Sequence, residues 1–395
     1  DTYPGHVTES TDTLISIENI EGSRYRDNLT GDAYANHLIG NDGSDILRGA
    51  AGDDQLEGGK GGDELTGGQG ADYLDGGEGR DVATYIDSAQ GVVIDLQTTI
   101  AQRGDAEGDT FANIEDIDGS KFIDILRGDA QDNTLSGFAG DDGLIGQAGN
   151  DSLFGGDGQD ILYGEDGEDK LYGGDKDDEL YGGLKDDTLQ GGRGADLLDG
   201  GDGSDLASYT DSSSVEINLA EGTAKGGNAE GDTLINIEGI EGSAFGDDVL
   251  IGDEKSNALI GLGGDDILVG SQGTTNNEID ILTGGAGKDE FWLIERRPLD
   301  LVSSNGIDTN TYNSFFLIFY NNNSFNDYAL ITDFQPLEDS IHMSSGNYLA
   351  PTSGRLPAGT GIYRSGTNEI VAIIQGDLSL DITQEYFQEY LSLEG

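Results

Sequence analysis

The chain has 395 residues, of which 78 are Asp or Glu and 19 are Lys or Arg, so its formal net charge is −59 at pH 7. This charge excludes nucleic acid as a partner, because phosphate binding needs clustered Lys and Arg. Cysteine is absent, which excludes disulfides and thiolate metal sites. No apolar run approaches the ~18 residues of a membrane-spanning helix. Because like charges oppose compaction, the chain is either expanded or condensed by something positive.

A nine-residue repeat begins at Gly22, and glycine then recurs at every ninth position through Gly76. The eighth residue of each unit is Leu, from Leu29 to Leu74, and then Ala83. The sixth residues are Asp27, Asn36, Asp45, Asp54, Asp63, Asp72 and Asp81. This regular spacing defines a first array over residues 22–84.

A second array covers 119–208, and its eighth residue is Leu from Leu126 to Leu198 and then Ala207. Its sixth residues are Asp124, Asn133, Asp142, Asp151, Asp160, Asp169, Asp178, Asp187, Asp196 and Asp205. A third, less regular array has Asn257, Asp266, Asp280 and Asp289 at the sixth position. Extra residues within 273–279 predict a longer loop in that array.

The unit Gly-Gly-x-Gly-x-Asp-x-Leu-x favours a turn over its first six positions, because Gly readily adopts positive φ. The last three positions predict a short strand whose central side chain points inward. Two units then make one 18-residue turn of a coil, with a strand on each side and parallel pairing between stacked turns. A single turn buries almost nothing, so stacking is required for stability.

The unit resembles the RTX (repeats-in-toxin) calcium-binding nonapeptide. The full Gly-Gly-x-Gly-x-Asp string starts at Gly58, Gly67, Gly76, Gly155, Gly191, Gly200 and Gly284. The resemblance implies an all-β fold of right-handed parallel β-rolls in tandem, with Ca²⁺ held between turns by sixth-position carboxylates and loop carbonyls. Roughly a dozen or more ions are expected, each taking 6–8 oxygen ligands. The implied ligands are Asp27, Asp45, Asp54, Asp63, Asp72, Asp81, Asp124, Asp142, Asp151, Asp160, Asp169, Asp178, Asp187, Asp196, Asp205, Asp266, Asp280 and Asp289.

Some units depart from the pattern. Asn36, Asn133 and Asn257 replace Asp near the opening of each array, so we expect weak sites or caps there. Lys176 and Lys185 replace Gly at the fourth position, and we expect weaker binding or a changed loop in those two units.

The segments that join the arrays are themselves repeated. Residues 85–118 and 209–241 both end in Asp-Thr-(Phe/Leu)-x-Asn-Ile-Glu followed by a few residues and an array. Alternating apolar residues predict strands at 92–96 and 215–219. A shortened copy at 12–18 leads us to expect that the sequence begins within such a module.

After Trp292 the acidic repeats end. Residues 329–343 resemble the segment that often closes an RTX roll, 363–375 predict a strand or hairpin, and 381–391 fit a short amphipathic helix. The region is expected to be an export signal, an apolar cap on the open roll, or both. The predicted segments are a shortened connector with the first roll at 1–84, a connector with the central roll at 85–208, a connector with the third roll at 209–292, and a β-rich C-terminal capping or secretion-signal-like domain at 293–395.

Signatures of catalysis are missing from the sequence. The three histidines, His6, His37 and His342, lie far apart and form no His-Glu-x-x-His motif. No Ser has Gly at both −2 and +2, and no phosphate-binding loop occurs. We therefore expect no enzymatic activity, and we interpret the Arg-Gly-Asp tripeptides at 103–105 and 127–129 as chance matches.

Aromatic residues recur at the ninth position as Phe154, Tyr163, Tyr172 and Tyr181. They could stack on sugars or on a partner chain. Their β propensity and cross-strand packing explain them more simply as outward strand residues.

The prediction for function is an extracellular calcium-binding protein, type I secreted, that folds on Ca²⁺ after export. Extracellular modules bind Ca²⁺ at about 10⁻⁴–10⁻³ M, so these arrays would fill outside the cell. A structural or adhesive role in a surface layer, fibril or matrix is expected, with copies of the chain or cell-surface polysaccharide as partners. The alternative is the C-terminal secretion and folding region of a larger secreted enzyme or toxin.

Overall fold

The computed structural model describes residues 17–270 and 279–293 together with short strands further along the chain. It contains two compact units, residues 1–128 and 129–395. The described regular structure is strand apart from two short 3₁₀ turns, which confirms the predicted all-β fold. No described helix is long and apolar enough to cross a membrane. The predicted segment boundaries at residues 84, 208 and 292 stay predictions.

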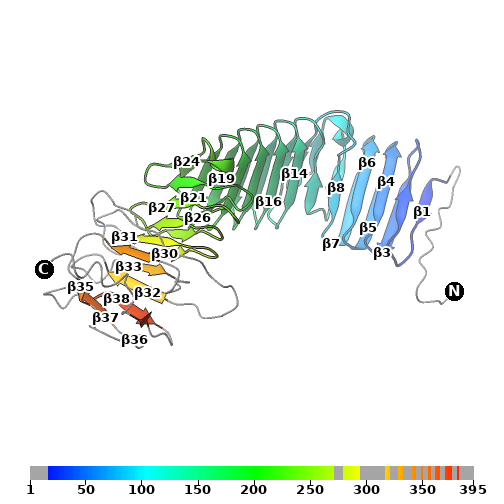
Figure 1. Ribbon diagram of the computed structural model, residues 1–395. Helices are drawn as coiled ribbons and strands as arrows, with labels where there is room; N and C mark the ends of the chain where they lie inside the picture. Colours follow the sequence, from blue (N-terminus) through cyan, green and yellow to red (C-terminus); the bar gives the residue numbers. More distant parts are fainter. Residues whose placement is uncertain are drawn as a thin grey trace. The chain divides into compact units, whose positions relative to one another are not determined.

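In the first array of the first unit, drawn in blue in Figure 1, each of the first six strands pairs in parallel with the strand two positions further along the chain. Leu38 therefore stands beside Leu56, and Leu47 stands beside Leu65. The strands are β1 (Asn19–Glu21), β2 (Asn28–Thr30), β3 (His37–Asp42), β4 (Ile46–Ala51), β5 (Gln55–Gly61), β6 (Glu64–Gln69), β7 (Tyr73–Gly79) and β8 (Val82–Thr84).

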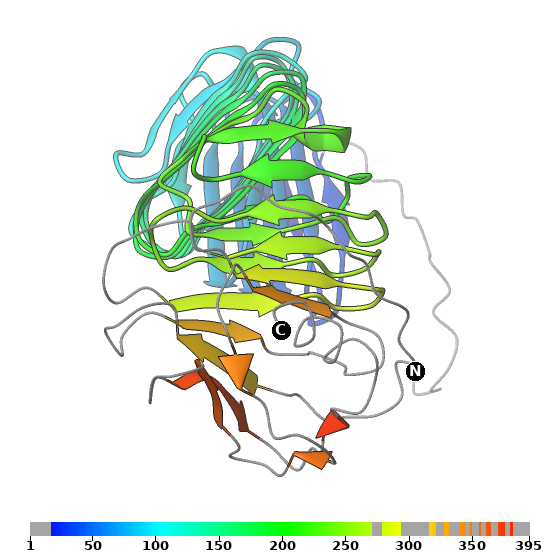
Figure 2. The same cartoon turned by 60° about the vertical axis from the view of Figure 1, so that its left-hand side comes forward.

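The second unit continues the same pattern, and Figure 2 shows its strands stacked from green to yellow. The central array gives β14 (Thr134–Ala139), β15 (Gly143–Ala148), β16 (Ser152–Asp157), β17 (Ile161–Asp166), β18 (Lys170–Asp175), β19 (Glu179–Leu184), β20 (Thr188–Arg193), β21 (Leu197–Asp202) and β22 (Leu206–Ser208). The third array gives β27 (Val249–Ile251), β28 (Ala258–Ile260), β29 (Ile267–Val269), β30 (Ile279–Thr283) and β31 (Glu290–Leu293).

The core consists of the eighth-position side chains, which point inward from the facing strands. Each such Leu from Leu38 to Leu74 and from Leu126 to Leu198 is 0 % exposed. Outward residues of the same strands are exposed or half-buried, as the two-residue period requires. The inward Leu positions predicted from the repeat are confirmed.

Two pairs of ninth-position aromatic rings stack across neighbouring turns. The ring centroids of Phe154 and Tyr172 are 4.7 Å apart, and those of Tyr163 and Tyr181 are 4.8 Å apart. The strands that carry each pair are adjacent and in register. Cross-strand packing therefore accounts for these rings, as the sequence indicated.

Both connectors continue the roll and add an outward hairpin. In the first unit, β11 pairs in parallel with β7, β12 with β8, and β13 with β9, while β10 runs antiparallel to β9. In the second unit, β25 pairs with β21, β26 with β22, and β27 with β23, while β24 runs antiparallel to β23. The elements are β9 (Val93–Asp95), β10 (Ile100–Gln102), η1 (Gly104–Ala106), β11 (Thr110–Ala112), β12 (Asp116–Asp118), β13 (Ile125–Arg127), β23 (Glu216–Asn218), β24 (Thr223–Lys225), η2 (Gly227–Ala229), β25 (Thr233–Ile235) and β26 (Gly239–Glu241). The strands predicted within 92–96 and 215–219 are confirmed.

Beyond the third array, parallel pairing continues from β30 to β33 and from β31 to β34. Antiparallel pairs then follow, including β32 with β38 and β37 with β38, so the predicted hairpin within 363–375 is present. The strands are β32 (Phe316–Tyr320), β33 (Tyr328–Ile331), β34 (Ser340–Met343), β35 (Tyr348–Leu349), β36 (Arg355–Leu356), β37 (Gly361–Arg364), β38 (Ile370–Gln375) and β39 (Leu380–Asp381). The predicted helix at 381–391 lies outside the described residues except for Asp381, and most of the predicted 273–279 loop also lies outside them.

Glycine at the fourth position allows neighbouring turns to approach closely, as Gly61 illustrates. Its φ is +137°, and a Cβ at Gly61 would overlap the carbonyl oxygen of Gly43 in the neighbouring turn. We expect Gly61→Ala to destabilise the calcium-loaded protein by about 1–3 kcal/mol, measured by urea unfolding. Gly62→Ala is the matched control, because the fifth position carries Ser44 and Asp53 in other units. Equal unfolding midpoints for the two variants would contradict this account.

The two lysines at the fourth position keep the left-handed backbone. Lys176 and Lys185 have φ values of +86° and +77°. The Lys176 N–H donates to the Arg193 carbonyl at 2.6 Å, and the equivalent Gly158 N–H donates to the Asp175 carbonyl at 3.1 Å. The inter-turn hydrogen bond is therefore retained although a side chain replaces the glycine.

Candidate metal centres

The sixth-position aspartates form hydrogen-bonded ladders along the rolls. Each aspartate forms one rung, and in most rungs of the first and central arrays one carboxylate oxygen accepts the backbone N–H of the sixth-position residue 18 positions earlier. Asp63 Oδ1 accepts from Asp45 at 2.7 Å, and Asp178 Oδ1 accepts from Asp160 at 2.8 Å. The repeat length therefore sets the ladder, because 18 residues make one turn.

The second carboxylate oxygen, Oδ2, is buried and has no hydrogen-bond donor among the described residues in most rungs. These side chains are at most 3 % exposed. A buried charged oxygen without a partner carries a large desolvation penalty. The atoms are therefore consistent with a series of cation sites between the turns. They belong to Asp45, Asp54, Asp63, Asp72, Asp81, Asp151, Asp160, Asp169, Asp178, Asp187, Asp196, Asp205 and Asp266.

Each of these oxygens lies beside the first-position glycine of its own unit. A Cβ on Gly155 would come closer than 3.0 Å to both Asp160 Oδ2 and the carbonyl oxygen of Gly173. The same holds for a Cβ on Gly40, which would meet Asp45 Oδ2 and a carbonyl of the next turn. A carboxylate oxygen and a carbonyl oxygen of the next turn therefore both lie beside the first-position glycine. The glycine has no side chain that would occupy this space.

The protein surroundings disfavour the negative charge of these carboxylates. Burial, as the main cause, raises the pKa of Asp178 and Asp266 to about 8 and the pKa of Asp151 and Asp187 to about 7. The accepted N–H lowers each pKa, and neighbouring carboxylates raise it again. A cation placed between the turns would reverse this effect by stabilising the charged form.

The donor set fits Ca²⁺. No group of three or more His, Cys, Asp or Glu side chains gathers in the part of the chain that the structure describes. Carboxylates can therefore supply only part of a coordination sphere, and backbone carbonyls must supply the rest. Ca²⁺ accepts such mixed oxygen sets in flexible geometry, whereas structural zinc prefers Cys and His.

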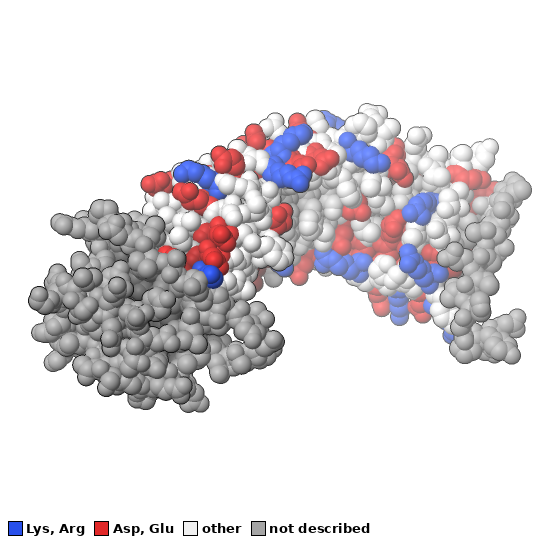
Figure 3. Space-filling model, viewed as in Figure 1, with Lys and Arg blue, Asp and Glu red and all other residues white. Residues whose placement is uncertain are grey.

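The exposed charges have a different arrangement from the buried ones. On the face drawn in Figure 3, Asp and Glu side chains are interspersed with Lys and Arg. Several of these groups pair, such as Arg48 with Glu64 at 2.7 Å and Arg80 with Asp116 at 2.7 Å. Exposed groups can therefore pair with one another or with solvent, whereas the buried Oδ2 atoms named above have no donor among the described residues.

The remaining proposed ligands occupy related positions. Asp142 and Asp289 are buried, and Asp280 and Asp289 accept ladder N–H groups at 3.0 and 3.1 Å. Asp27 differs, because its Oδ2 accepts the Ser23 N–H at 2.5 Å and the residue is half-buried. Asp124 also has donors, namely the Ser120 N–H at 2.6 Å and the Ser120 hydroxyl at 2.9 Å. The assignment of all these residues as ligands stays a prediction.

The side-chain oxygen of each of the three sixth-position asparagines accepts a backbone N–H of its own unit. The Asn36 Oδ1 accepts the Asp32 N–H at 2.7 Å, and Asn133 and Asn257 accept the equivalent N–H groups at 2.8 Å. Each amide therefore uses its oxygen within its own unit, and the expectation of weak sites or caps at these positions stays a prediction.

Sequence reasoning missed several acidic residues of the connectors that stand in the ladder register. Asp109 Oδ1 accepts the Asp72 N–H at 2.8 Å, Asp232 Oδ1 accepts the Asp196 N–H at 2.9 Å, and Asp248 Oδ1 accepts the Val215 N–H at 2.8 Å. The available signal was an Asp followed two residues later by an apolar residue, as in every repeat. Glu115 and Glu238 likewise accept backbone N–H groups of array residues, namely those of Asp81 and Asp205.

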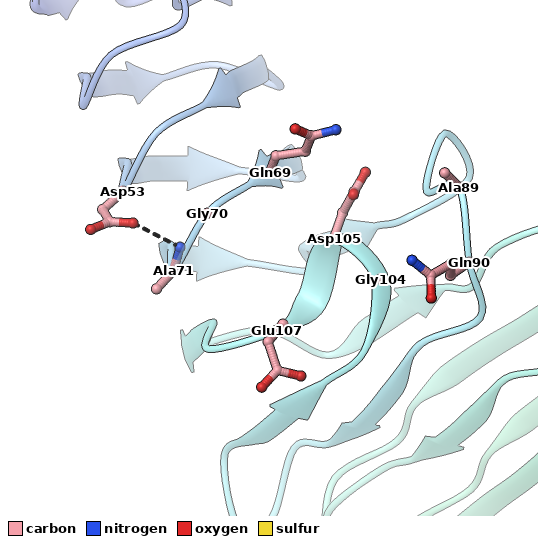
Figure 4. Close-up of a pocket in the computed structure, with 9 residues that line it drawn as sticks. All are labelled: Asp53, Gln69, Gly70, Ala71, Ala89, Gln90, Gly104, Asp105 and Glu107. Carbon is pink, nitrogen blue, oxygen red and sulfur yellow. Dashed lines mark hydrogen bonds between the residues drawn. The ribbon is translucent and has the colours of Figure 1, made fainter.

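A groove of about 530 Å³ lies in the first unit between the loop at 69–71 and the connector. Figure 4 shows its acidic side chains: Asp105 and Glu107 come from the connector, Asp53 comes from another segment, and the three do not converge on one point. Asp53 Oδ1 accepts a hydrogen bond from the Ala71 N–H at 3.1 Å. The other lining residues are Gln, Gly and Ala, so the groove brings together no nucleophile with a base.

Comparison with known proteins supports the metal assignment. The family model of the RTX calcium-binding nonapeptide repeat matches residues 21–56, 48–83, 118–153, 144–171, 172–207 and 244–276. No curated protein matches the chain. Among solved structures, the extracellular lipase LipA from Serratia marcescens is similar at 21% identity and a TM-score of 0.16, over 46% of this chain. That match spans only 34% of the lipase, and it carries no argument about function. The chain therefore contains RTX calcium-binding nonapeptide repeats, folded as a parallel β-roll.

Proposed function

We propose that the chain is an extracellular calcium-binding protein that folds as Ca²⁺ fills its ladders after type I export, and that it has a structural or adhesive role at the cell surface. The observation that carries this proposal is the series of buried Oδ2 atoms named above, which have no donor among the described residues. RTX repeats are typical of type I secreted extracellular proteins, and the matched repeats span all three arrays.

The residues of the chain prepare the sites in a defined way. The inter-turn N–H fixes Oδ1 of each rung, the first-position glycine leaves space beside Oδ2, and the inward Leu holds adjacent turns in register. When bound, Ca²⁺ supplies the positive charge and the oxygen coordination that the buried carboxylates lack. Because complete sites exist only between stacked turns, binding favours the folded state over the unfolded chain.

The proposed role is structural or adhesive because the sequence contains no zinc-protease, lipase or phosphate-binding motif. Copies of the same chain or a cell-surface polysaccharide are the proposed partners. The stacked rings of Phe154 and Tyr172 are partly exposed, and flat exposed rings of this kind can contact sugars.

Calorimetric calcium titration tests the proposal. The wild-type protein is expected to bind roughly a dozen or more ions. Asp160→Asn with Asp178→Asn should reduce the ion count and lower the melting temperature, because both residues belong to one ladder. The charge-matched control is Asp157→Asn with Asp166→Asn, which removes two exposed carboxylates from the central array. Equal ion counts for the two double variants would show that the sixth-position carboxylates are not ligands.

A further inference from the structure

Two aspartates of the connectors occupy the same ladder place as the proposed ligands but have different surroundings. Asp109 and Asp232 each accept the N–H of the preceding rung through Oδ1, as array residues do. Their Oδ2 atoms are also satisfied, by the hydroxyls of Tyr85 at 2.8 Å and Tyr209 at 3.0 Å. A protein donor thus stands where most array rungs have none among the described residues.

Tyr85 and Tyr209 are suited to donate to these carboxylates because both are buried and remain protonated. Tyr85 is 2 % exposed and Tyr209 is 1 % exposed. Burial raises the pKa of both hydroxyls well above the ordinary value of 10, and the neighbouring carboxylates raise it further. Each hydroxyl therefore remains a hydrogen-bond donor at any physiological pH.

In the arrays, the glycine five positions before each aspartate lies beside its Oδ2, and this arrangement differs at Asp109 and Asp232. The residues five positions before Asp109 and Asp232 are Gly104 and Gly227. The three atoms nearest to a Cβ on either glycine would be serine hydroxyl and backbone carbonyl oxygens of the connector, and the aspartate oxygen is not among them. These glycines lie in η1 and η2, which replace the open nonapeptide loop.

The arrangement is repeated, so it is a property of the connector module. Asn113 Nδ2 donates to Asp75 at 2.7 Å, and Asn236 Nδ2 donates to Asp199 at 2.8 Å. The Tyr–Asp pair therefore occurs twice within the same local network, once in each compact unit.

We propose that the rungs at Asp109 and Asp232 bind no calcium, because the hydroxyls of Tyr85 and Tyr209 take the place of the ion. This inference rests on the proposed calcium-dependent function of the neighbouring rungs. Each connector then ends one calcium ladder with a metal-independent rung, and the bound ions fall into separate groups along the chain.

Counting bound calcium in matched variants tests the proposal. Asp109→Asn with Asp232→Asn should leave the number of ions per chain unchanged, measured by equilibrium dialysis and atomic absorption at saturating Ca²⁺. Asp72→Asn with Asp196→Asn changes the preceding rung of each ladder and should remove about two ions, on the order of one per rung. Equal losses in both double variants would overturn the proposal. If the wild-type protein bound no calcium, the proposed function itself would fail, which is a distinct outcome.

The tyrosines provide a second test that does not depend on changing a carboxylate. Tyr85→Phe with Tyr209→Phe removes both donors and leaves two buried Oδ2 atoms without a partner. We expect either about two additional bound ions or a lower melting temperature at saturating Ca²⁺. Tyr163→Phe, which changes a partly exposed hydroxyl on the outer face, is the control. An unchanged ion count together with an unchanged melting temperature would overturn the proposal.

Discussion

Removal of calcium with excess EGTA is expected to abolish the folded β-roll and leave an expanded chain. The formal charge of −59 opposes compaction, and the ladders bury carboxylate oxygens that have no donor within the described residues. Without a cation both effects act against folding. Far-UV circular dichroism should lose its β signal, and the hydrodynamic radius should increase towards that of an unfolded chain.

Two controls separate specific binding from simple screening. Excess Ca²⁺ should restore the spectrum, whereas Mg²⁺ should restore little, because it demands a smaller octahedral site and keeps its waters. Added NaCl should also restore little, since salt screens buried charges much less than exposed ones. A β spectrum that persists unchanged in EGTA would refute calcium-dependent folding.

Acid is expected to stabilise the calcium-free fold and to weaken calcium binding. Burial raises the pKa of Asp178 and Asp266 from 3.8 to about 8, and that of Asp160 to about 6, in the folded chain without metal. Between pH 4 and pH 8 the folded state therefore binds more protons than the unfolded chain. This contribution to stability is fully present below pH 3.8 and is lost as the pH rises through about 6 to 8.

The measurement is a pair of pH series, one of far-UV circular dichroism of protein freed of calcium by dialysis and one of calcium affinity. Residual β structure of the calcium-free protein should increase from pH 8 to pH 5, while calcium affinity should fall over the same range because protons and Ca²⁺ compete for the same oxygens. Asp178→Asn with Asp266→Asn should weaken both pH dependences. Greater stability of the calcium-free protein at pH 8 than at pH 5 would contradict the assignment.

The repeat explains why so much of the fold was predictable. A nine-residue period places one inward Leu and one Asp in every unit, and each unit can pair only with its neighbours. Leu162 and Asp160 could therefore be assigned to the core and to the ladder from their positions alone, and both are buried. Local periodicity is sufficient in the regular arrays because their ladder contacts recur at a separation of 18 residues.

The ladder positions of the connector residues, such as Asp109, could not be predicted from the repeat period. Asp109 is 37 residues from Asp72, the residue whose N–H it accepts, and 24 residues from Tyr85. No repeated spacing in the arrays predicts either contact. The role of Asp109 depends on how the outward hairpin of β9 and β10 returns the chain to the roll.

The sequence by itself determined the β-roll, its inward Leu and its acidic sixth positions, because these follow from the period of the repeat. Only the tertiary structure distinguished rungs whose Oδ2 has no donor from rungs that already have one. The physical reason is that a carboxylate becomes a metal ligand through what surrounds its oxygens. In this chain the hydroxyl of a tyrosine 23 or 24 residues away donates to Oδ2 of Asp109 and of Asp232 and so fills that space.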